Sequence, residues 1–319
     1  MILKKLAYRF LGIMAMLAAL TSGSFASAAK RSRDAVIQLV TQIQRSDYEG
    51  DRTALKRLYG ELTPFLQNKH LVSRVEYWRG FALWRRALNG FNESVDPKEL
   101  QEDLEQAVAD FKQASAADPS FTDAKIGAGS CLSNLMFLNQ KNTSRMPELI
   151  AEAGRVLKEA RAEAPENPRL YWVLGPNLWY APAEHGGSQS QAIEMYQKGL
   201  ELTRTGKGRT SDPLEPSWGE PELLMNLAWS NLHRTTQDLK AAKSYAQSAL
   251  DLVPYWHYVK DILMPQIDKA IDMAIRANAE PTRDESPHNP MARARLGPER
   301  PQFAIHLPAA MPLLEFGGA

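Results

Sequence analysis

A spacing of small residues that recurs four times constrains the fold of this chain more than any other feature. The copies place residues four, three and five positions apart: Ala107, Phe111, Ala114 and Pro119; Ala153, Leu157, Ala160 and Pro165; Ala192, Tyr196, Gly199 and Arg204; Ala242, Ala246, Ala249 and Pro254. Small residues three and four apart share one face of a helix and let a second helix approach closely. A proline just past the helix end prevents its continuation. Each copy therefore predicts the second helix of a helical hairpin.

The first helices of these hairpins repeat more loosely. Small residues stand where a partner helix must pass close by, at Gly80, Gly129, Gly175 and Ala228. Apolar residues at helical spacing also predict an opening hairpin over residues 34–67 and a closing helix over residues 256–277, bent near Pro265. The sequence therefore predicts an all-α solenoid of helical hairpins, with about four expanded repeats between the opening hairpin and the closing helix.

One stretch carries a known signature. Tyr171, Leu174, Gly175 and Leu178, followed by Ala192 and Tyr196, resemble the tetratricopeptide (TPR) pattern W-x2-L-G-x2-Y…A-x3-F. The small residue of the second helix recurs after 46, 39 and 50 residues (153 − 107, 192 − 153 and 242 − 192), whereas an ordinary TPR repeats after about 34. The surplus residues lie at 89–102, 139–147 and 205–221. Such insertions carry specificity in some solenoids and are plain surface loops in others, and the sequence leaves both open.

The two ends of the chain are expected to lie outside the repeat domain. Lys4, Lys5 and Arg9 precede an apolar run over residues 10–20 and then small residues, which is the layout of a cleavable signal peptide. The apolar run is too short to span a bilayer. We therefore expect a signal peptide over residues 1–29, a periplasmic or otherwise secreted repeat domain over residues 30–277, and a disordered, proline- and arginine-rich tail over residues 278–319.

The sequence offers few reactive groups. The chain has 38 Lys and Arg against 37 Asp and Glu, a formal net charge of +1, whereas nucleic-acid-binding proteins usually carry a basic face. Cys131 is the only cysteine, which excludes a disulfide within the chain. Glu184 and His185 stand side by side in a turn, but no further residue at metal-ligand spacing accompanies them. We therefore expect a protein that is not an enzyme, with no metal, no cofactor and no nucleic-acid partner.

Aromatic residues are the main candidates for binding. The candidate groove residues are Trp78, Trp84, Tyr171, Trp172, Trp179 and Tyr180, with His185 close to them in the chain. Large residues at helical spacing often form core between repeats. The alternative is an aromatic-lined groove or pore that takes a peptide or an apolar small molecule. Pro176, inside the same predicted helix, favours a bend that opens space beside it.

A second resemblance concerns the turn inside the third hairpin. Pro182, Gly186 and Gly187 ahead of Ala192 resemble the proline and double-glycine turn of extracytoplasmic TatT-like TPR proteins, which accompany TRAP-type solute transporters. The resemblance spans about residues 72–275. It implies an all-α fold around a central cavity or pore, association with a solute-binding protein, and a hydrophobic ligand. The chain departs from that family in having no lipid-attachment cysteine and in its tail from residue 278.

Two functions follow from these observations. The first is a secreted, non-catalytic scaffold that binds a protein partner, such as a solute-binding protein, on its concave face. The alternative is a carrier that holds an apolar small molecule in an aromatic-lined cavity. A closed cavity lined by Trp172, Trp179 and Tyr180 would favour the carrier, whereas an open polar groove would favour the scaffold.

Overall fold

The computed structural model describes residue 27 and residues 29–279. Within these residues the chain consists of helices and connecting segments and contains no strand. Residues 1–26, 28 and 280–319 lie outside the described part, and with them lie nearly all of the predicted signal peptide and of the predicted disordered tail.

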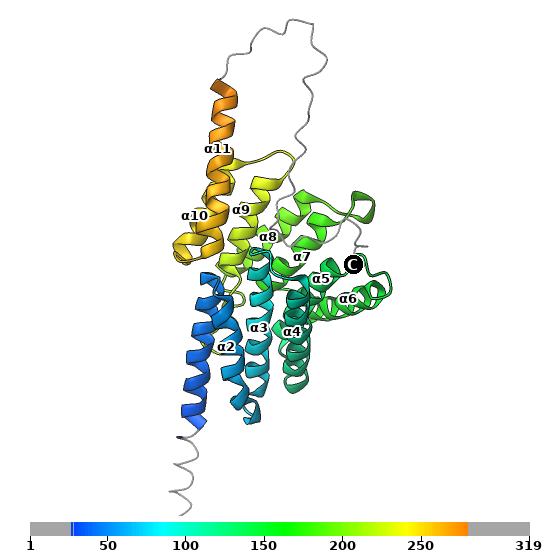
Figure 1. The fold of residues 1–319 in the computed structure, drawn as a ribbon, viewed down its shortest axis with the longest axis vertical. Coiled ribbons are helices and arrows are strands. Elements are labelled where there is room, and N and C mark those ends of the chain that lie inside the picture. Colours follow the sequence, from blue (N-terminus) through cyan, green and yellow to red (C-terminus); the bar gives the residue numbers. More distant parts are fainter. Residues whose placement is uncertain (1–26, 28, 280–319) are drawn as a thin grey trace, which may run out of the picture.

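The helices follow one another in antiparallel order through the described chain (Figure 1). After a first helix over residues 29–49 come α2 (Arg52–Leu62), α3 (Val72–Phe91), α4 (Pro97–Ala117), α5 (Thr122–Leu138), α6 (Met146–Glu163), α7 (Pro168–Tyr180), α8 (Gln189–Arg204), α9 (Glu220–His233), α10 (Leu239–Leu252) and α11 (Met264–Ala279). Two short 3-10 helices cover Thr63–Gln67 and Ala183–His185, and a π-helix covers Tyr258–Leu263.

Short polar side chains set the starts of several helices. Asp51, Asp96, Asn167, Ser188 and Asp238 each precede a helix and accept a hydrogen bond from a backbone N–H of its first turn. These side chains satisfy amide groups that have no partner inside the helix. The starts of these helices are therefore marked by residues next to them in the sequence.

The helices pack as hairpins, α3 on α4, α5 on α6, α7 on α8 and α9 on α10. In three pairs a glycine of the first helix lies against a large residue of the second: Gly80 against Phe111, Gly129 against Leu157, and Gly175 against Tyr196. A Cβ at Gly129 or Gly175 would overlap the facing side chain. The predicted all-α fold of helical hairpins is confirmed.

The array is not a uniform stack of repeats. α4 packs on α5 and α8 packs on α9, whereas α6 and α7 make little contact and α7 packs instead on α5 and α9. The expected insertion at residues 89–102 is largely helical, because only residues 92–96 separate α3 from α4. By contrast, residues 205–219 form a long connection between α8 and α9.

The predicted closing helix consists of two parts. The π-helix Tyr258–Leu263 passes into α11 at Met264, one residue before Pro265. Proline lacks a backbone N–H and its ring displaces the carbonyl four residues earlier, so the regular α-helical bond pattern cannot run through this position. The change of helix type thus lies where the sequence predicted a bend.

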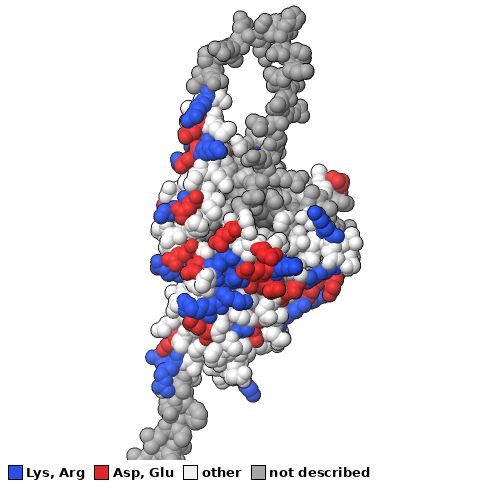
Figure 2. All heavy atoms as spheres, viewed as in Figure 1, with Lys and Arg blue, Asp and Glu red and all other residues white. Residues whose placement is uncertain are grey.

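The surface shown in Figure 2 carries basic and acidic side chains that are interspersed, without a large patch of one sign. None of the helices in the described ranges is long and apolar enough to cross a bilayer.

Candidate functional site

The first helices of the four hairpins share one inner face, which we define as the sides of α3, α5, α7 and α9 that pack on one another or line the cavity described below. Residues near the N-terminal ends of α3 and α7 contact the connection 205–219. Residues nearer the C-terminal ends of α3, α5 and α7 line a cavity. The inner face therefore has a filled end, which contacts the connection 205–219, and a cavity end.

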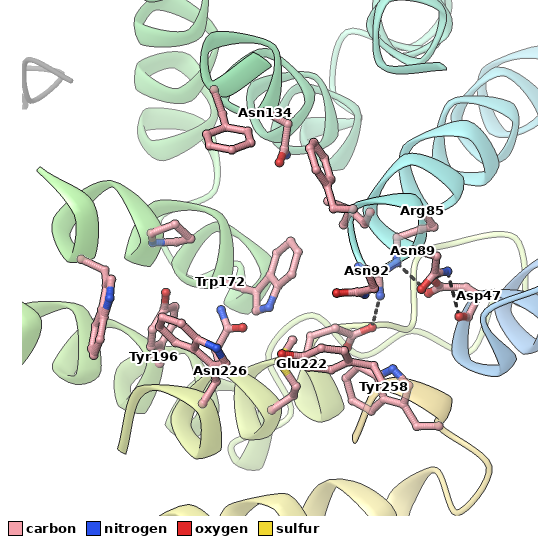
Figure 3. Close-up of a pocket in the computed structure, with 18 of the residues that line it drawn as sticks. Asp47, Arg85, Asn89, Asn92, Asn134, Trp172, Tyr196, Glu222, Asn226 and Tyr258 are labelled. Atoms are coloured by element: carbon pink, nitrogen blue, oxygen red, sulfur yellow. Dashed lines mark hydrogen bonds and ion pairs between the residues drawn. The ribbon is translucent and has the colours of Figure 1, made fainter. Parts of the chain in front are cut away.

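The cavity has a volume of about 120 Å³ and is partly enclosed. Its walls are mainly aromatic (Figure 3). The aromatic lining residues are Phe91, Phe137, Trp172, Trp179, Tyr180, Tyr196, Trp229, Trp256 and Tyr258. The polar lining residues are Asp47, Arg85, Asn89, Asn92, Asn134, Glu222 and Asn226. Apolar walls with a few converging polar groups are typical of small-molecule sites.

Helix α7 contributes most to the aromatic wall. Trp172, Pro176, Trp179 and Tyr180 all line the cavity from this one helix. Pro176 has no N–H to donate to the carbonyl of Trp172, so one regular helical hydrogen bond is absent beside the cavity. The rings of Trp179 and Trp229, from α7 and α9, meet edge to face with centroids 5.2 Å apart, an arrangement that aromatic rings prefer.

A buried ion cluster forms another part of the wall. The Arg85 guanidinium donates from Nε to Asp47 Oδ2 at 2.6 Å and from Nη2 to Glu222 Oε1 at 2.8 Å. Glu222 Oε1 also accepts a hydrogen bond from the Tyr48 hydroxyl at 2.9 Å, and Glu222 Oε2 accepts one from the Gly219 N–H at 2.7 Å. The cluster joins α3, α9 and the first helix, and it brings together residues 47, 85 and 222 that are far apart in the sequence.

Burial and charge act in opposite directions on the groups of this cluster. Burial lowers the pKa of Arg85, but the attraction of Asp47 and Glu222 outweighs it, so that the pKa lies above its ordinary value. Burial raises the pKa of Asp47, and Arg85 opposes that rise. Burial also raises the pKa of the Tyr196 and Tyr258 hydroxyls. The guanidinium therefore stays charged and the cavity tyrosines stay neutral at physiological pH.

One polar atom in the aromatic wall has no partner. Trp172 is 2% exposed, and its indole N–H makes no hydrogen bond to any residue that the structure describes. Figure 3 shows Trp172 near Asn226 and Glu222. A buried donor without an acceptor costs about 1–3 kcal/mol.

The other end of the inner face is filled by the connection 205–219. Leu214 and Trp218 are buried against the helices. Trp78 Nε1 donates to the Leu214 carbonyl at 2.7 Å, and Trp218 Nε1 donates to the Tyr77 hydroxyl at 2.9 Å. No residue of this connection is among those that line the cavity.

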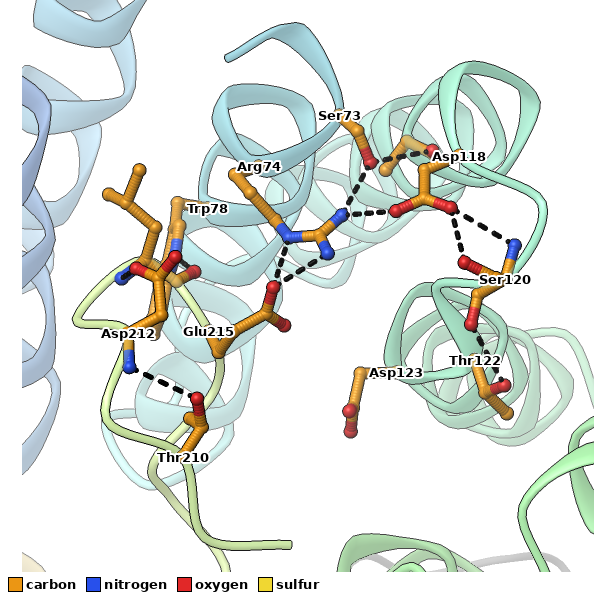
Figure 4. Close-up of polar contacts among 12 residues, drawn as sticks. Ser73, Arg74, Trp78, Asp118, Ser120, Thr122, Asp123, Thr210, Asp212 and Glu215 are labelled. Atoms are coloured by element: carbon orange, nitrogen blue, oxygen red, sulfur yellow. Dashed lines mark hydrogen bonds and ion pairs between the residues drawn. The ribbon is translucent and has the colours of Figure 1, made fainter. Parts of the chain in front are cut away.

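Ion pairs and hydrogen bonds from two arginines fasten this connection to the helices. Arg74 of α3 pairs with Glu215 of the connection and with Asp118 (Figure 4). Arg169 of α7 donates to both carboxylate oxygens of Asp123, at 2.5 and 2.9 Å, and also to the Gly208 and Trp218 carbonyls. The connection is thus part of the core and not a free surface loop.

The structure places the candidate groove residues in different surroundings. Trp172, Trp179 and Tyr180 line the cavity. Trp78 and Trp84 do not, because both are fully buried in an aromatic cluster with Trp218 and neighbouring rings. Tyr171 lies away from the cavity and donates from its hydroxyl to the Pro165 carbonyl at 2.8 Å. The backbone of His185 lies in a 3-10 helix, and its side chain is outside the described part.

Several cavity residues were not singled out from the sequence. They are Asp47, Arg85, Asn134, Tyr196 as a lining residue, Glu222, Asn226, Trp229, Trp256 and Tyr258. The signal that could have found the ion cluster is Arg85, one of three arginines, with Arg79 and Arg86, in the otherwise largely apolar run from residue 77 to 88. A charge at that position of a buried helix requires a buried partner, although the sequence does not say which carboxylate it is.

Metal-ligating side chains and the cysteine thiol are the remaining groups of the described ranges to be considered. No group of three or more His, Cys, Asp or Glu that could hold a metal ion occurs among these residues. Cys131 is buried, and burial raises the pKa of its thiol. A thiol of this kind is a poor nucleophile.

Comparisons with known proteins add one structural likeness. No family model matches the chain, and no curated protein matches it. Among solved structures, the chain overlaps with the HusA haemophore from Porphyromonas gingivalis at a TM-score of 0.48 and 19% sequence identity, over 63% of this chain and 93% of the haemophore.

Proposed function

We propose that this protein is a non-catalytic carrier that holds an apolar small molecule in the aromatic cavity of its inner face. The observation that carries the proposal is the combination of that cavity with Trp172 in its wall, a buried residue whose indole N–H has no partner among the described residues. A tightly packed core leaves no room for such a cavity. A ligand with an apolar body and one hydrogen-bond acceptor would fill the space and complete the missing bond.

The scaffold alternative receives less support from the geometry. A peptide partner would need the concave side of the first helices to be accessible. The N-terminal ends of α3 and α7 are covered by the chain's own connection 205–219, through Leu214 and Trp218. The other end is a cavity with aromatic walls and not an open polar groove.

The rest of the proposal extends the sequence predictions. We propose that the hairpins are a diverged TPR-like array, related to the extracytoplasmic TatT-like proteins. The carrier would then be exported to the periplasm by residues 1–29 and would exchange its ligand with a solute-binding protein. It would not be an enzyme, because the buried carboxylates Asp47 and Glu222 are held by Arg85 and are not poised beside a nucleophile.

The proposal is tested by purifying the full chain from an expressing bacterium and comparing native with denaturing mass spectrometry. We expect a mass excess in the native spectrum that is released on denaturation. The excess should be lost in Trp179→Ala, which opens the cavity wall, and kept in Tyr255→Ala, a partly exposed aromatic residue outside the cavity. The absence of any bound molecule, together with no thermal stabilisation of the wild type by tert-butylbenzene, would exclude the carrier function.

A further inference from the structure

The charged groups of the cavity wall do not balance. Among the described residues that line the cavity, Asp47 and Glu222 are acidic and Arg85 alone is basic. With both carboxylates ionised, the wall has a formal charge of −1. Glu222 is 0% exposed and Asp47 is 5% exposed, so water screens this excess charge poorly.

The single guanidinium is already engaged by its neighbours. Arg85 holds Asp47 through Nε and Glu222 through Nη2, and it lies over the rings of Trp84, Trp172 and Trp218 at 5.5, 5.7 and 5.8 Å from their centroids. An anionic ligand would therefore add a second buried negative charge without gaining a free cation. A cationic ligand would bring the total charge of the wall and ligand to zero.

The aromatic walls favour the same sign of charge. The faces of tryptophan and tyrosine rings are electron-rich and attract cations, and a cluster of such rings is a known way to bind ammonium groups. Trp172, Trp179, Trp229 and Trp256 are among the rings that line the cavity. Asn134 adds an acceptor, because its Nδ2 donates to the Ser130 carbonyl and leaves its Oδ1 to face the cavity (Figure 3).

We propose that the cavity selects ligands with a positively charged nitrogen, a protonated or quaternary amine, attached to an apolar body. This inference rests on the proposed carrier function and names the chemical class of its ligand. The surplus carboxylate charge and the aromatic faces would hold the amine head, while the remaining aromatic rings would pack on the apolar body.

The test uses probes that differ in charge and little in shape. Phenyltrimethylammonium and tert-butylbenzene are nearly isosteric, and phenylacetate supplies the opposite charge on a similar body. Binding of each to the full chain is measured by tryptophan fluorescence and by calorimetry. We expect the ammonium to bind about tenfold more tightly than the hydrocarbon, the size of effect given by one or two cation–π contacts, and phenylacetate to bind more weakly than either.

Asp47→Asn provides the variant that removes the surplus charge. The amide of this variant keeps an oxygen to accept from Arg85, and the wall becomes neutral, so the tenfold preference for the ammonium should fall to about parity. Asp110→Asn is the matched control: Asp110 is a buried carboxyl that does not line the cavity, and the preference should survive its replacement. Thermal unfolding shows whether both variants are folded.

The outcomes separate this inference from the carrier function. If tert-butylbenzene or phenylacetate binds as tightly as the ammonium or more tightly, the cavity is a carrier site without the proposed charge selection. A preference that is unchanged in folded Asp47→Asn would likewise overturn the inference. If none of the three probes binds, the inference fails, and the carrier function fails with it when no molecule co-purifies with the protein. Should Asp47→Asn not fold, the isosteric pair on the wild type decides alone.

Discussion

The filled end and the cavity end of the inner face are built on the same helices but differ in what occupies them. At the filled end, α3 and α7 meet the connection 205–219, and the indole N–H groups of Trp78 and Trp218 each have an acceptor. At the cavity end the indole N–H of Trp172 has no acceptor among the described residues, although its ring centroid lies only 5.5 Å from that of Trp218; the N–H of Trp84, which does not line the cavity, is likewise without a partner there. Adjacent tryptophans of one cluster thus differ in whether the chain completes their hydrogen bonds.

The difference shows what an insertion does in a helical array. Hairpins with longer spacing leave room between their first helices, and that room must be filled by side chains, by another segment or by a ligand. The connection 205–219 supplies Leu214, Trp218 and backbone carbonyls at one end. At the other end this connection contributes no lining residue, and the room remains as the cavity.

The largest expected effect comes from the ion pair that fastens the filled end. Arg169→Met should lower the free energy of unfolding by about 3–5 kcal/mol, because it leaves the buried Asp123 carboxylate without its guanidinium. Urea denaturation measures the change. Adding Asp123→Asn to this variant should recover part of the loss, and a cost below about 1 kcal/mol for Arg169→Met alone would show that the connection is not held as described.

The paired indoles at the filled end give the next prediction. Trp78→Phe should destabilise the protein by about 1–3 kcal/mol beyond the loss of ring area, because the buried Leu214 carbonyl loses its donor. Trp84→Phe is the control, since Trp84 is in the same helix, equally buried, and its N–H has no partner. Equal costs for the two variants in chemical denaturation would contradict the proposed role of this hydrogen bond.

Replacing Gly175, which lies behind the cavity wall, is expected to lower the stability to a similar or smaller extent. Gly175→Ala should cost about 1–3 kcal/mol, because the added methyl overlaps the Tyr196 ring and displaces a residue that lines the cavity. Ligand binding should weaken as well. Gly60→Ala, in α2 with open space around the site, should instead be neutral or stabilising by up to about 1 kcal/mol, and differential scanning calorimetry compares the two.

The smallest effect on stability is expected at the unpartnered indole. Beyond the loss of ring area, Trp172→Phe should change the free energy of unfolding of the ligand-free protein by no more than about 1 kcal/mol, because the N–H it removes has no acceptor among the described residues. The same variant should retain less co-purified ligand in native mass spectrometry. A destabilisation as large as that of Trp78→Phe would indicate that the chain itself, and not a ligand, satisfies this group.

The helical hairpins could be predicted because their signals are local. The spacing of Phe111, Leu157 and Tyr196 among small residues marks one helix face, and Gly129 and Gly175 are the places where two of those large residues fit. The helix boundaries between residues 89 and 102 were harder to predict. Both flanking helices extend into a stretch that exceeds the length of a TPR repeat and was therefore interpreted as an insertion.

The site could be predicted only in part. Trp172, Trp179 and Tyr180 share one helix with Pro176, so a single local pattern marked them. Trp78 and Trp84 carry the same kind of pattern, yet they are core residues. Amphipathic spacing shows that an aromatic residue faces inward, but it does not show whether the space beyond it is filled.

The sequence by itself determined the all-α hairpin architecture, since helix caps, small-residue spacing and terminating prolines all act within neighbouring turns of the chain. Only the tertiary structure decided that residues 205–219 fill one end of the inner face, and that Asp47, Arg85 and Glu222 meet at the other. Those contacts join residues up to 175 positions apart (222 − 47), and their pairing depends on how the hairpins stack. No local pattern encodes that stacking, because every hairpin presents a similar apolar face to its neighbours.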